Sequence, residues 1–401
     1  MIVRVAAPAS TRYPTSTMST ARATAAAAEI DRINTFFPLM TRLGNRFART
    51  RPWEGRVIGV NAHLTTLTAA LVRELSLGGG EWVVSAANEA TTDIRVVELL
   101  RGQGIAVHTG GDLRNRHKGL LDHRPDLIAD VGFELLDTLL DHRTEQVDEI
   151  QAAVEITRSG ISRLRTRTNL PWPVVNLNDG LIKHNVENRR GVGEALWTSV
   201  RDLTGTHLSG RRVLVVGYGP VGQGVAAYAK AHGAVVEVYE VDPIRCLVAH
   251  YDGFATPELT AGLEEVEIVV TATGRRHAIS VAHLRGLKNG VVLVNAGHGG
   301  DEIDIDGLRA SASSGVEIGD NCTRYRLDGG PWLTVLGGGH PLNIVTNAGS
   351  PEPVLLHFAV VALTLEWLAK ETPQTRGEVQ VPRSIEEEAA RLALAALTGR
   401  P

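Results

Sequence analysis

Three glycines stand at a spacing that suits the binding of a dinucleotide. The run Gly217-x-Gly219-x-x-Gly222 follows the apolar residues 213–216 and precedes a helical pattern. In such a turn the first glycine permits a tight bend, the second lets the backbone approach a pyrophosphate, and the third lets helix and strand pack closely. Free N–H groups at the start of the helix favour phosphate. The expected contacts are Gly217, Gly219, Pro220, Val221 and Gly222, and a glycine-rich turn without a ligand is the alternative.

An acidic residue at the end of the next apolar run indicates which dinucleotide is bound. Glu240 closes the run 234–240, where a carboxylate accepts hydrogen bonds from the ribose hydroxyls of the nucleotide. The same charge repels a 2′-phosphate, so the sequence predicts NAD as the cofactor. Arg245 nearby keeps NADP as an alternative. Asp242 competes for the ribose role, but Pro243 follows it, so Asp242 is predicted to cap a helix instead.

Two further apolar runs end in residues that suit the nicotinamide half of such a cofactor. Ligands of parallel α/β sheets bind at the carboxyl ends of the strands. The run 268–274 ends there with small and hydroxyl residues, and the run 291–298 ends with polar ones. The expected contacts are Thr271, Ala272, Thr273, Asn295, Gly297 and His298.

The elements that must position these residues follow a repeating pattern. Short apolar runs alternate with helical patterns over about 56–130 and again over 212–337. Strands separated by helices pair in parallel. The predicted fold class is therefore α/β, with two doubly wound parallel-sheet domains; the family resemblance described below implies that a Rossmann NAD-binding domain is inserted into a substrate-binding domain. The expected divisions are a flexible N-terminus (1–28), a substrate domain (29–180, completed by 346–372), a six-stranded Rossmann domain (181–345) and a C-terminal tail with a short helix (373–401).

Composition excludes several classes of protein. The 401 residues carry 41 basic and 45 acidic side chains, so no global field attracts nucleic acid or an anionic membrane. No apolar run approaches the ~18 residues of a membrane-spanning helix. Two cysteines, Cys246 and Cys322, make neither a disulfide framework nor a four-thiolate zinc site, and no metal is expected. We expect a cytoplasmic protein with a small-molecule substrate and no nucleic-acid or membrane partner.

Beyond these patterns, the sequence resembles the S-adenosylhomocysteine hydrolases from about residue 38 to 397. The resemblance is strongest over 178–343, and a weaker match is Ala62-His-Leu-Thr65. The motifs that carry it are Asn178-Asp-Gly-Leu-Ile-Lys183, Glu187-Asn188, Gly217-Tyr-Gly-Pro-Val-Gly222, Glu240-Val-Asp-Pro243, Thr271-Ala-Thr-Gly274, Asn295-Ala-Gly-His298, Glu302-Ile-Asp304, Arg324-Tyr-Arg-Leu327 and Asn343.

The resemblance implies a redox cycle on bound NAD. That family oxidises the 3′-hydroxyl of a nucleoside ribose, eliminates the 5′ thiol, adds water and reduces the ketone again. By resemblance Lys183 is the base and Asn188 supports it, while His298 and His63 line the reacting sugar. Glu187 stands where the family has the Asp that holds the ribose hydroxyls. An ordinary surface lysine and a packed or capping histidine are the alternatives for Lys183 and His63. The resemblance also implies NAD contacts from Asn343, Thr157, Arg158 and Ser159, and substrate contacts from Thr65, Asp130 and Ser350.

The departures from the family fall on the substrate side. Val131 replaces an acid/base Asp, Ile156 replaces a substrate-binding Glu, and Ser350 replaces the purine-recognising His. A site that loses polar partners loses discrimination for its substrate. We therefore expect NAD-dependent transient oxidation that drives elimination, hydration or epimerisation on a different nucleoside-like or sugar-like substrate.

Other functions remain open. These are genuine S-adenosylhomocysteine hydrolysis, a dehydrogenase that releases NADH, and a non-catalytic NAD or nucleoside sensor. The family is commonly tetrameric, and the apolar run 353–368 is a candidate interface. Because the chain lacks the family's C-terminal Lys and Tyr, we expect a homo-oligomer, dimer or tetramer, that holds NAD less tightly.

Overall fold

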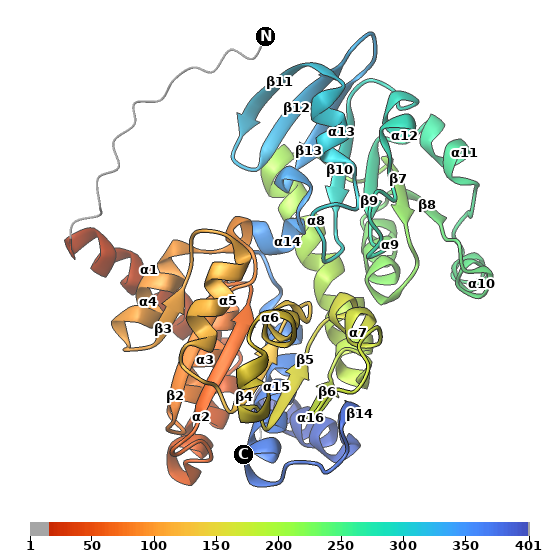
Figure 1. The fold of residues 1–401 in the computed structure, drawn as a ribbon. Coiled ribbons are helices and arrows are strands. Elements are labelled where there is room, and N and C mark those ends of the chain that lie inside the picture. Colours follow the sequence, from red (N-terminus) through yellow and green to blue (C-terminus); the bar gives the residue numbers. More distant parts are fainter. Residues whose placement is uncertain (1–15, 400–401) are drawn as a thin grey trace. The chain divides into compact units, whose positions relative to one another are not determined.

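The computed structural model describes residues 16–399, which form two compact units (Figure 1). We call residues 188–350 the inserted unit, and residues 16–187 together with 351–399 the outer unit. The chain passes from one unit to the other between Glu187 and Asn188, inside the π-helix η3 (Lys183–Gly191), and returns between Ser350 and Pro351.

The outer unit is built on a sheet of seven parallel strands. Their order is β14-β6-β5-β4-β1-β2-β3, so the chain reverses its direction of travel across the sheet between β1 and β4. Strands covered on both faces are apolar throughout, which explains the short continuous apolar runs. The strands are β1 (Val57–Ala62), β2 (Glu81–Ala86), β3 (Ala106–His108), β4 (Leu127–Asp130), β5 (Ala152–Glu155), β6 (Pro173–Asn176) and β14 (Gly377–Gln380).

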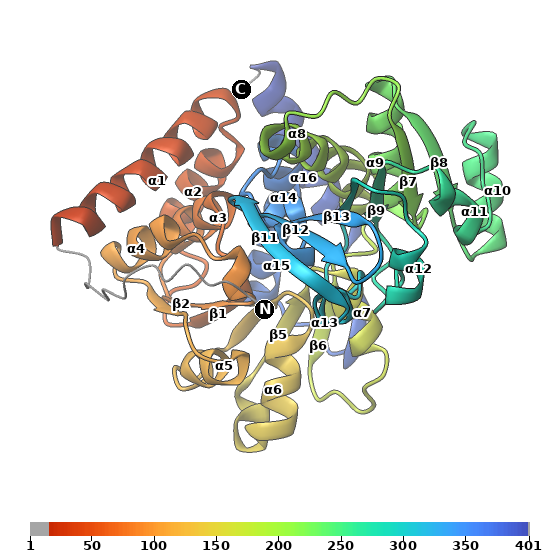
Figure 2. The ribbon, with the colours of Figure 1, turned by 90° about the horizontal axis from the view of Figure 1, so that it is seen from above.

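Helices cover both faces of this sheet because alternate residues of each strand point to opposite sides. Figure 2 shows α1–α4 on one side of the strands and α5 and α6 on the other. The first core contains α1 (Ser16–Phe36), α2 (Leu39–Thr50), α3 (Thr66–Ser76), α4 (Ile94–Gly102), α15 (Pro351–Lys370) and α16 (Arg383–Thr398). The second contains α5 (Leu113–Leu121), α6 (Glu134–His142) and α7 (Arg158–Leu164), and short 3-10 turns lie at η1 (Glu89–Thr91) and η2 (Thr144–Glu149).

Both ends of the outer unit correct the prediction from sequence. A flexible segment over 1–28 is wrong from Ser16 onward, because α1 begins there and buries Ala26 and Ile30 completely; residues 1–15 lie outside the described part. The expected tail over 373–401 is wrong too, since β14 pairs with β6 and α16 packs against α15. Tertiary packing, which a local pattern does not display, stabilises both segments.

Helix α15 meets a membrane-span criterion by length and composition, contrary to the expectation that no apolar run does. It has 20 residues with a mean hydropathy of 1.5 in its best window. Most of that window is buried inside the outer unit, among residues such as Leu355, Val361 and Leu368. A core helix meets the same criterion, and the burial of α15 also leaves little of it to form the expected subunit interface.

The inserted unit has the expected Rossmann arrangement with one more strand than the six predicted. Its sheet order is β11-β12-β13-β10-β9-β7-β8, in which β12 and β11 are antiparallel additions beside β13. The strands are β7 (Arg212–Val216), β8 (Val235–Tyr239), β9 (Ile268–Thr271), β10 (Val291–Asn295), β11 (Ala312–Gly319), β12 (Cys322–Leu327) and β13 (Trp332–Leu336). The helices are α8 (Val192–Thr204), α9 (Pro220–Ala231), α10 (Pro243–Tyr251), α11 (Leu259–Glu264), α12 (Val281–Arg285), α13 (Ile305–Ala310) and α14 (Leu342–Val345), with the turn η4 (Gly337–Gly339).

Candidate active site

The glycine turn of the inserted unit lies between β7 and α9, as a dinucleotide cradle requires. Gly217 has φ 101°, and a Cβ there would lie 2.7 Å from the carbonyl oxygen of Ala272. A Cβ on Gly222 would overlap the carbonyl oxygen of Gly217, so the turn closes on itself there. Above Gly219, by contrast, only Nη1 of Arg245 comes near, at 3.7 Å. The turn therefore leaves room for a phosphate at Gly219 and for no side chain at the other two glycines.

Glu240 ties the glycine turn to the end of β8. Its Oε2 accepts a hydrogen bond from the N–H of Tyr218 at 2.7 Å, and its Oε1 accepts one from the N–H of Asp242 at 2.9 Å. Each carboxylate oxygen keeps a further lone pair for a ribose hydroxyl. Asp242 is the N-cap of α10, since Oδ1 accepts from the N–H of Ile244, as its sequence context predicted. Glu240 can therefore still accept hydrogen bonds from the ribose hydroxyls of NAD at this strand end.

The ends of β9 and β10 are joined by a buried polar network. Thr271 donates to Asn295 Oδ1 at 3.2 Å, and the amide of Asn295 donates to the carbonyl oxygens of Gly299 and Gly339. The N–H of Gly297 also donates to Asn295 Oδ1. Asn295 is fully buried and holds these loops in place rather than facing solvent.

A second carboxylate, Glu302, organises the loop that follows β9. It is 1% exposed and accepts hydrogen bonds from the N–H and hydroxyl of Thr273 and from the N–H of Gly274. Burial raises the pKa of Glu302 above its ordinary value, against the lowering effect of these donors. Thr273 is thus positioned by Glu302, while Ala272 is half-buried at the same strand end.

The other predicted residues of the inserted unit lie in its loops and short helices. Asn188 is half-buried within η3, His298 is half-buried after β10, and Asn343 is half-buried on α14. Ser350 lies within reach of the carbonyl oxygen of Gly191 (3.2 Å) and of Glu194 Oε2 (3.1 Å). Its single hydroxyl proton can serve only one of these at a time.

In the outer unit, Lys183 and Glu187 form a largely buried ion pair. Their side chains lie four residues apart in η3 and are 10% and 12% exposed. Lys183 Nζ lies 2.5 Å from Glu187 Oε1. Burial raises the pKa of Glu187, and the charge of Lys183 partly offsets this. Lys183 is therefore not an ordinary surface lysine, and π-helical segments such as this one are frequent at functional sites.

Asp130 and Glu155 are neighbours on β4 and β5, and both are completely buried. Asp130 accepts hydrogen bonds from Asn61 Nδ2 at 2.8 Å and from the N–H of Leu136 at 3.0 Å. Burial and the charge of Glu155 raise the pKa of Asp130 well above its ordinary value. Both oxygens of Asp130 accept hydrogen bonds, and its side chain is not exposed. Asp130 therefore stabilises the start of α6, and the expectation that it binds the substrate is wrong.

Thr157, Arg158 and Ser159 begin α7 in the outer unit. Thr157 is the N-cap, accepting from the N–H of Gly160, and its hydroxyl donates to Glu155 Oε1 at 2.7 Å. The hydroxyl of Ser159 lies 3.2 Å from that of Thr157, and Arg158 is exposed. These three residues, which were expected to contact NAD, belong to a different unit from the glycine turn.

His63 and Thr65 follow β1, beside the point where the sheet reverses. His63 Nδ1 lies 2.7 Å from the hydroxyl of Thr91. Thr65 is the N-cap of α3, accepting from the N–H of Thr68 at 3.3 Å. Ligands of doubly wound sheets bind at this reversal, which here lies between β1 and β4, and Val131 follows β4 there.

The predicted catalytic set is thus only partly assembled within one unit. Lys183 and Glu187 are in direct contact, whereas Asn188 and His298 belong to the inserted unit. Sequence reasoning missed a further histidine, His357 of α15, whose Nε2 lies 3.9 Å from Glu187 Oε2. It lies in the apolar run 353–368, which was expected to form a subunit interface, and a single imidazole in that run was the available signal. Within residues 16–399 no cluster of three or more His, Cys, Asp or Glu side chains suits a metal ion.

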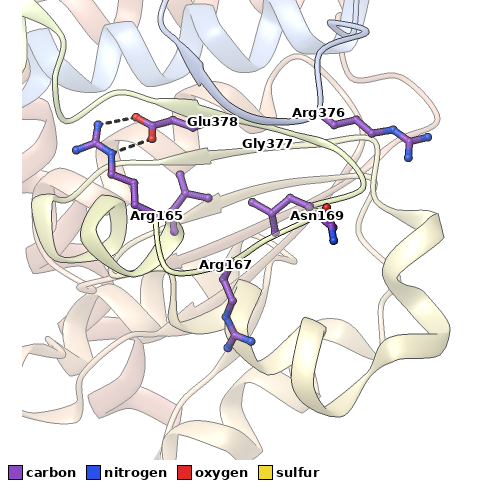
Figure 3. A pocket seen from close by; sticks show the side chains of 8 residues that line it. Arg165, Arg167, Asn169, Arg376, Gly377 and Glu378 are labelled. Carbon is purple, nitrogen blue, oxygen red and sulfur yellow. Dashed lines mark hydrogen bonds and ion pairs between the residues drawn. The ribbon is translucent and has the colours of Figure 1, made fainter.

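A separate cavity of about 440 Å³ lies beside the amino ends of β6 and β14 (Figure 3). Its charged lining is largely neutralised, since Arg165 pairs with Glu378 and Asp179, and Arg167 pairs with Asp137 and Asp141. Ligands in doubly wound sheets bind at the carboxyl ends of strands. The cavity is therefore not the candidate active site.

Comparison with known proteins identifies the family. Residues 188–349 match the sequence profile described as S-adenosyl-L-homocysteine hydrolase, NAD binding domain. An adenosylhomocysteinase of Thermococcus kodakarensis is 34% identical over 380 residues, covering 92% of this chain and 90% of that protein. An S-inosyl-L-homocysteine hydrolase of Methanopyrus kandleri is 33% identical over 368 residues, covering 89% and 87%. The chain is therefore a divergent member of the S-adenosyl-L-homocysteine hydrolase family, a family of enzymes whose NAD-binding domain it carries.

Proposed function

We propose that this enzyme transiently oxidises a ribose or sugar hydroxyl of a nucleoside-like substrate, and that the resulting ketone drives elimination, hydration or epimerisation. The observation that carries the proposal is the buried contact of Lys183 with Glu187, in a chain that also keeps the NAD cradle of its family. A sensor that only binds NAD needs no buried amine beside a carboxylate.

The residues of the inserted unit fit NAD. The backbone at Gly219 is open to a pyrophosphate, and Glu240 offers lone pairs to the ribose hydroxyls. Nη1 of Arg245, near Gly219, adds a positive charge close to the phosphates. When bound, NAD supplies a hydride acceptor for the carbon that bears the hydroxyl. The same carboxylate at Glu240 disfavours a 2′-phosphate, which supports NAD over NADP.

Lys183 and Glu187 handle the proton of that hydroxyl. A lysine accepts a proton only when its amine is neutral. Lys183 Nζ contacts Glu187 Oε1, and burial raises the pKa of Glu187, so this carboxyl group is placed to exchange a proton with the amine. Removing the hydroxyl proton as hydride leaves, and returning it in the reverse step, is general acid–base catalysis.

The residues on the substrate side of the site support a nucleoside substrate that is recognised differently from S-adenosylhomocysteine. Val131 and Ile156 stand where the family has carboxylates, and both are buried, 6% and 8% exposed. Ser350 is engaged with Gly191 or Glu194 and has no imidazole for a purine. An S-inosyl-L-homocysteine hydrolase is 33% identical to this chain, which supports a difference in the nucleobase that the substrate carries. The 34% identity to adenosylhomocysteinases favours S-adenosylhomocysteine as the second candidate.

The test is a substrate panel on the purified enzyme with NAD. Adenosine, inosine, their 5′-thioether derivatives and free sugars are added one at a time, and NADH absorbance and release of thiol are recorded together. Reduction of bound cofactor by a nucleoside supports the proposal, and thiol release from S-adenosylhomocysteine supports the second candidate. Net accumulation of free NADH would identify a dehydrogenase, and no reduction by any compound would favour a sensor.

We also propose that the enzyme is a cytoplasmic homo-oligomer. Both cysteines, Cys246 and Cys322, are free thiols, which suits a reducing compartment. Helix α10 exposes the apolar side chains of Ile244, Leu247 and Tyr251, which are 73%, 55% and 82% exposed. Contiguous exposed apolar side chains mark association surfaces. Light scattering that gives a monomer would contradict this.

A further inference from the structure

The cavity beside β6 and β14 is a feature of the outer unit that the proposed reaction does not use. Its volume of about 440 Å³ is within the range of ~300–1,000 Å³ that small-molecule sites in proteins occupy. Its lining combines three arginines with one glutamate, two leucines, an asparagine and a glycine (Figure 3). None of these residues belongs to the predicted catalytic set or to the NAD cradle. The cavity is therefore a candidate site for a second ligand.

Two of the three arginines are held in place by carboxylates. Arg165 donates from Nε to Glu378 Oε2 at 2.9 Å and from Nη2 to Glu378 Oε1 at 2.7 Å. Arg167 donates to Asp137 and Asp141, which do not line the cavity. These hydrogen bonds from Arg165 lower the pKa of Glu378 below its ordinary value. The one acidic group of the lining is therefore ionised and fully paired, and it leaves no free carboxylate in the cavity.

The third arginine has no such partner. Within residues 16–399 the guanidinium group of Arg376 makes no hydrogen bond or ion pair, and the same holds for the side-chain amide of Asn169. Asn169 also has a left-handed backbone conformation, with φ 59°, which asparagine adopts more readily than most residues. Figure 3 shows both side chains at one end of the cavity, with the Arg165–Glu378 pair at the other. One end of the cavity is therefore neutralised, and the other carries an unpaired positive charge.

The rest of the lining suits the organic part of a ligand. Gly377 has φ 80°, and a Cβ built on it would meet no atom within 4 Å, so its backbone leaves open space. Leu164 and Leu170, which are 2% and 7% exposed, contribute apolar carbon to the lining. A guanidinium group donates two parallel N–H groups to a carboxylate or a phosphate, and an amide adds a further donor. The lining thus offers donors for an oxyanion and apolar surface for the group that carries it.

We propose that this cavity binds a small organic anion, whose carboxylate or phosphate group is held by Arg376 and Asn169. The apolar part of the ligand lies against Leu164 and Leu170. A cation is disfavoured because the one carboxylate of the lining is already paired. A neutral ligand gains nothing from the charge of Arg376. The site is separate from the proposed reaction and gives the enzyme a second ligand.

Binding of three probes that share a phenyl ring tests this. Phenyl phosphate, benzoate and the neutral benzyl alcohol are titrated calorimetrically into the full chain saturated with NAD, which occupies the phosphate-binding turn at Gly219. Wild type is expected to bind one or both anions and not benzyl alcohol, and the anion that binds distinguishes phosphate esters from carboxylates. Arg376→Gln is expected to weaken this binding about tenfold or more, as the loss of a charge-assisted hydrogen bond implies. Arg376→Lys keeps the charge without the paired donors, so it should retain part of the affinity.

Another arginine of the same unit provides the matched control. Arg383 of α16 does not line the cavity, its side chain is 73% exposed, and its Nε lies 2.9 Å from Glu387 Oε1. Arg383→Gln also removes one positive charge and is expected to leave anion binding unchanged. Equal weakening in this variant would show that net charge, and not the cavity, determines the affinity, which would overturn the inference.

A measurement on wild type locates the ligand. With 15N-labelled asparagine, the anion that binds is expected to shift the side-chain amide resonance of Asn169, which is identified by its absence in Asn169→Ala. Because Arg376 is exposed and unpaired, Arg376→Gln should unfold at the wild-type temperature without ligand, so its loss of affinity reports binding alone. An unshifted Asn169 resonance, wild-type affinity in Arg376→Gln, equal binding of benzyl alcohol, or no binding of either anion would overturn the inference. Each of these outcomes leaves the proposed function standing.

Discussion

In the role proposed for them, Lys183 and Glu187 must meet two requirements that are hard to combine. A base must be neutral to accept a proton, and a buried amine must be compensated to stay folded. The contact of Nζ with Oε1 at 2.5 Å supplies the compensation, and burial raises the pKa of Glu187. His357 Nε2 lies 3.9 Å from the other carboxylate oxygen. At the scale of residues, then, the outer unit carries a small polar site inside an apolar core.

Replacing Lys183 by Met tests the proton-transfer role. The variant keeps a similar length and volume but accepts no proton, so we expect NAD to bind normally and cofactor reduction by substrate to slow by roughly 10²–10⁴-fold. Removing one partner of a buried pair also costs about 3–5 kcal/mol of stability. The double variant Lys183→Met/Glu187→Gln, which leaves no charge unpaired, should recover much of that stability and none of the rate. Stopped-flow NADH absorbance and urea unfolding measure the two effects, and an unchanged rate in the single variant would remove Lys183 from the mechanism.

The element that a short pattern predicts best is the strand–turn–helix of the dinucleotide site. A Cβ at Gly217 or Gly222 would meet a backbone carbonyl oxygen, and the space above Gly219 is open. Strand β7 and helix α9 flank the three glycines as expected. Sequence patterns predict helices and strands less well where tertiary packing determines whether they form. Ala-rich α1 reads as a polar, low-complexity start, yet Ala has a high helix propensity and Ala26 and Ile30 are buried. Likewise β14 becomes a strand only because β6 offers it a partner, and His357 is invisible in the apolar pattern of α15.

The glycine turn gives a prediction at the scale of that element. Gly222→Ala puts a Cβ onto the carbonyl oxygen of Gly217, so the turn must distort, and we expect both NAD affinity and the stability of the inserted unit to fall. Gly219→Ala meets only Nη1 of Arg245, at 3.7 Å, and Gly219 has an ordinary φ of −70°. This variant should unfold like wild type without NAD but bind NAD at least tenfold more weakly, because the Cβ occupies the approach of the pyrophosphate. Thermal unfolding with and without NAD separates the two outcomes; wild-type NAD affinity in Gly219→Ala would contradict the assignment.

At the scale of the whole molecule, stability should fall as pH rises through the neutral range. Burial raises the pKa of Glu155 to about 7 and that of Asp130 well above its ordinary value. Between about pH 4.5 and 7 the folded protein therefore holds protons that the unfolded chain has released, and the free energy of unfolding decreases as those protons are lost. For Glu155 alone the change is about 3 kcal/mol, at 1.36 kcal/mol for each pH unit.

Other groups act in the opposite direction at lower pH. Burial lowers the pKa of four histidines, so their contribution to stability increases as pH rises toward the ordinary histidine pKa of about 6.5 and is constant above it; they are His108, His117, His340 and His357. Asp141, Asp179, Glu267 and Glu378 have lowered pKa values, so their stabilisation is complete above about pH 4.5 and is lost only below it. We expect Asp130→Asn to flatten the decline between about pH 6.5 and pH 8, because it removes one of the two buried carboxyl groups that lose a proton there. Asp141 is exposed and paired with Arg167, so Asp141→Asn should leave this decline in stability unchanged. Urea unfolding followed by the fluorescence of Trp53, Trp82 and Trp172, which lie in the outer unit, measures it. A free energy of unfolding that rises from about pH 6.5 to pH 8 would show that the buried pair does not hold its proton, and that the donors around Glu155 outweigh its burial.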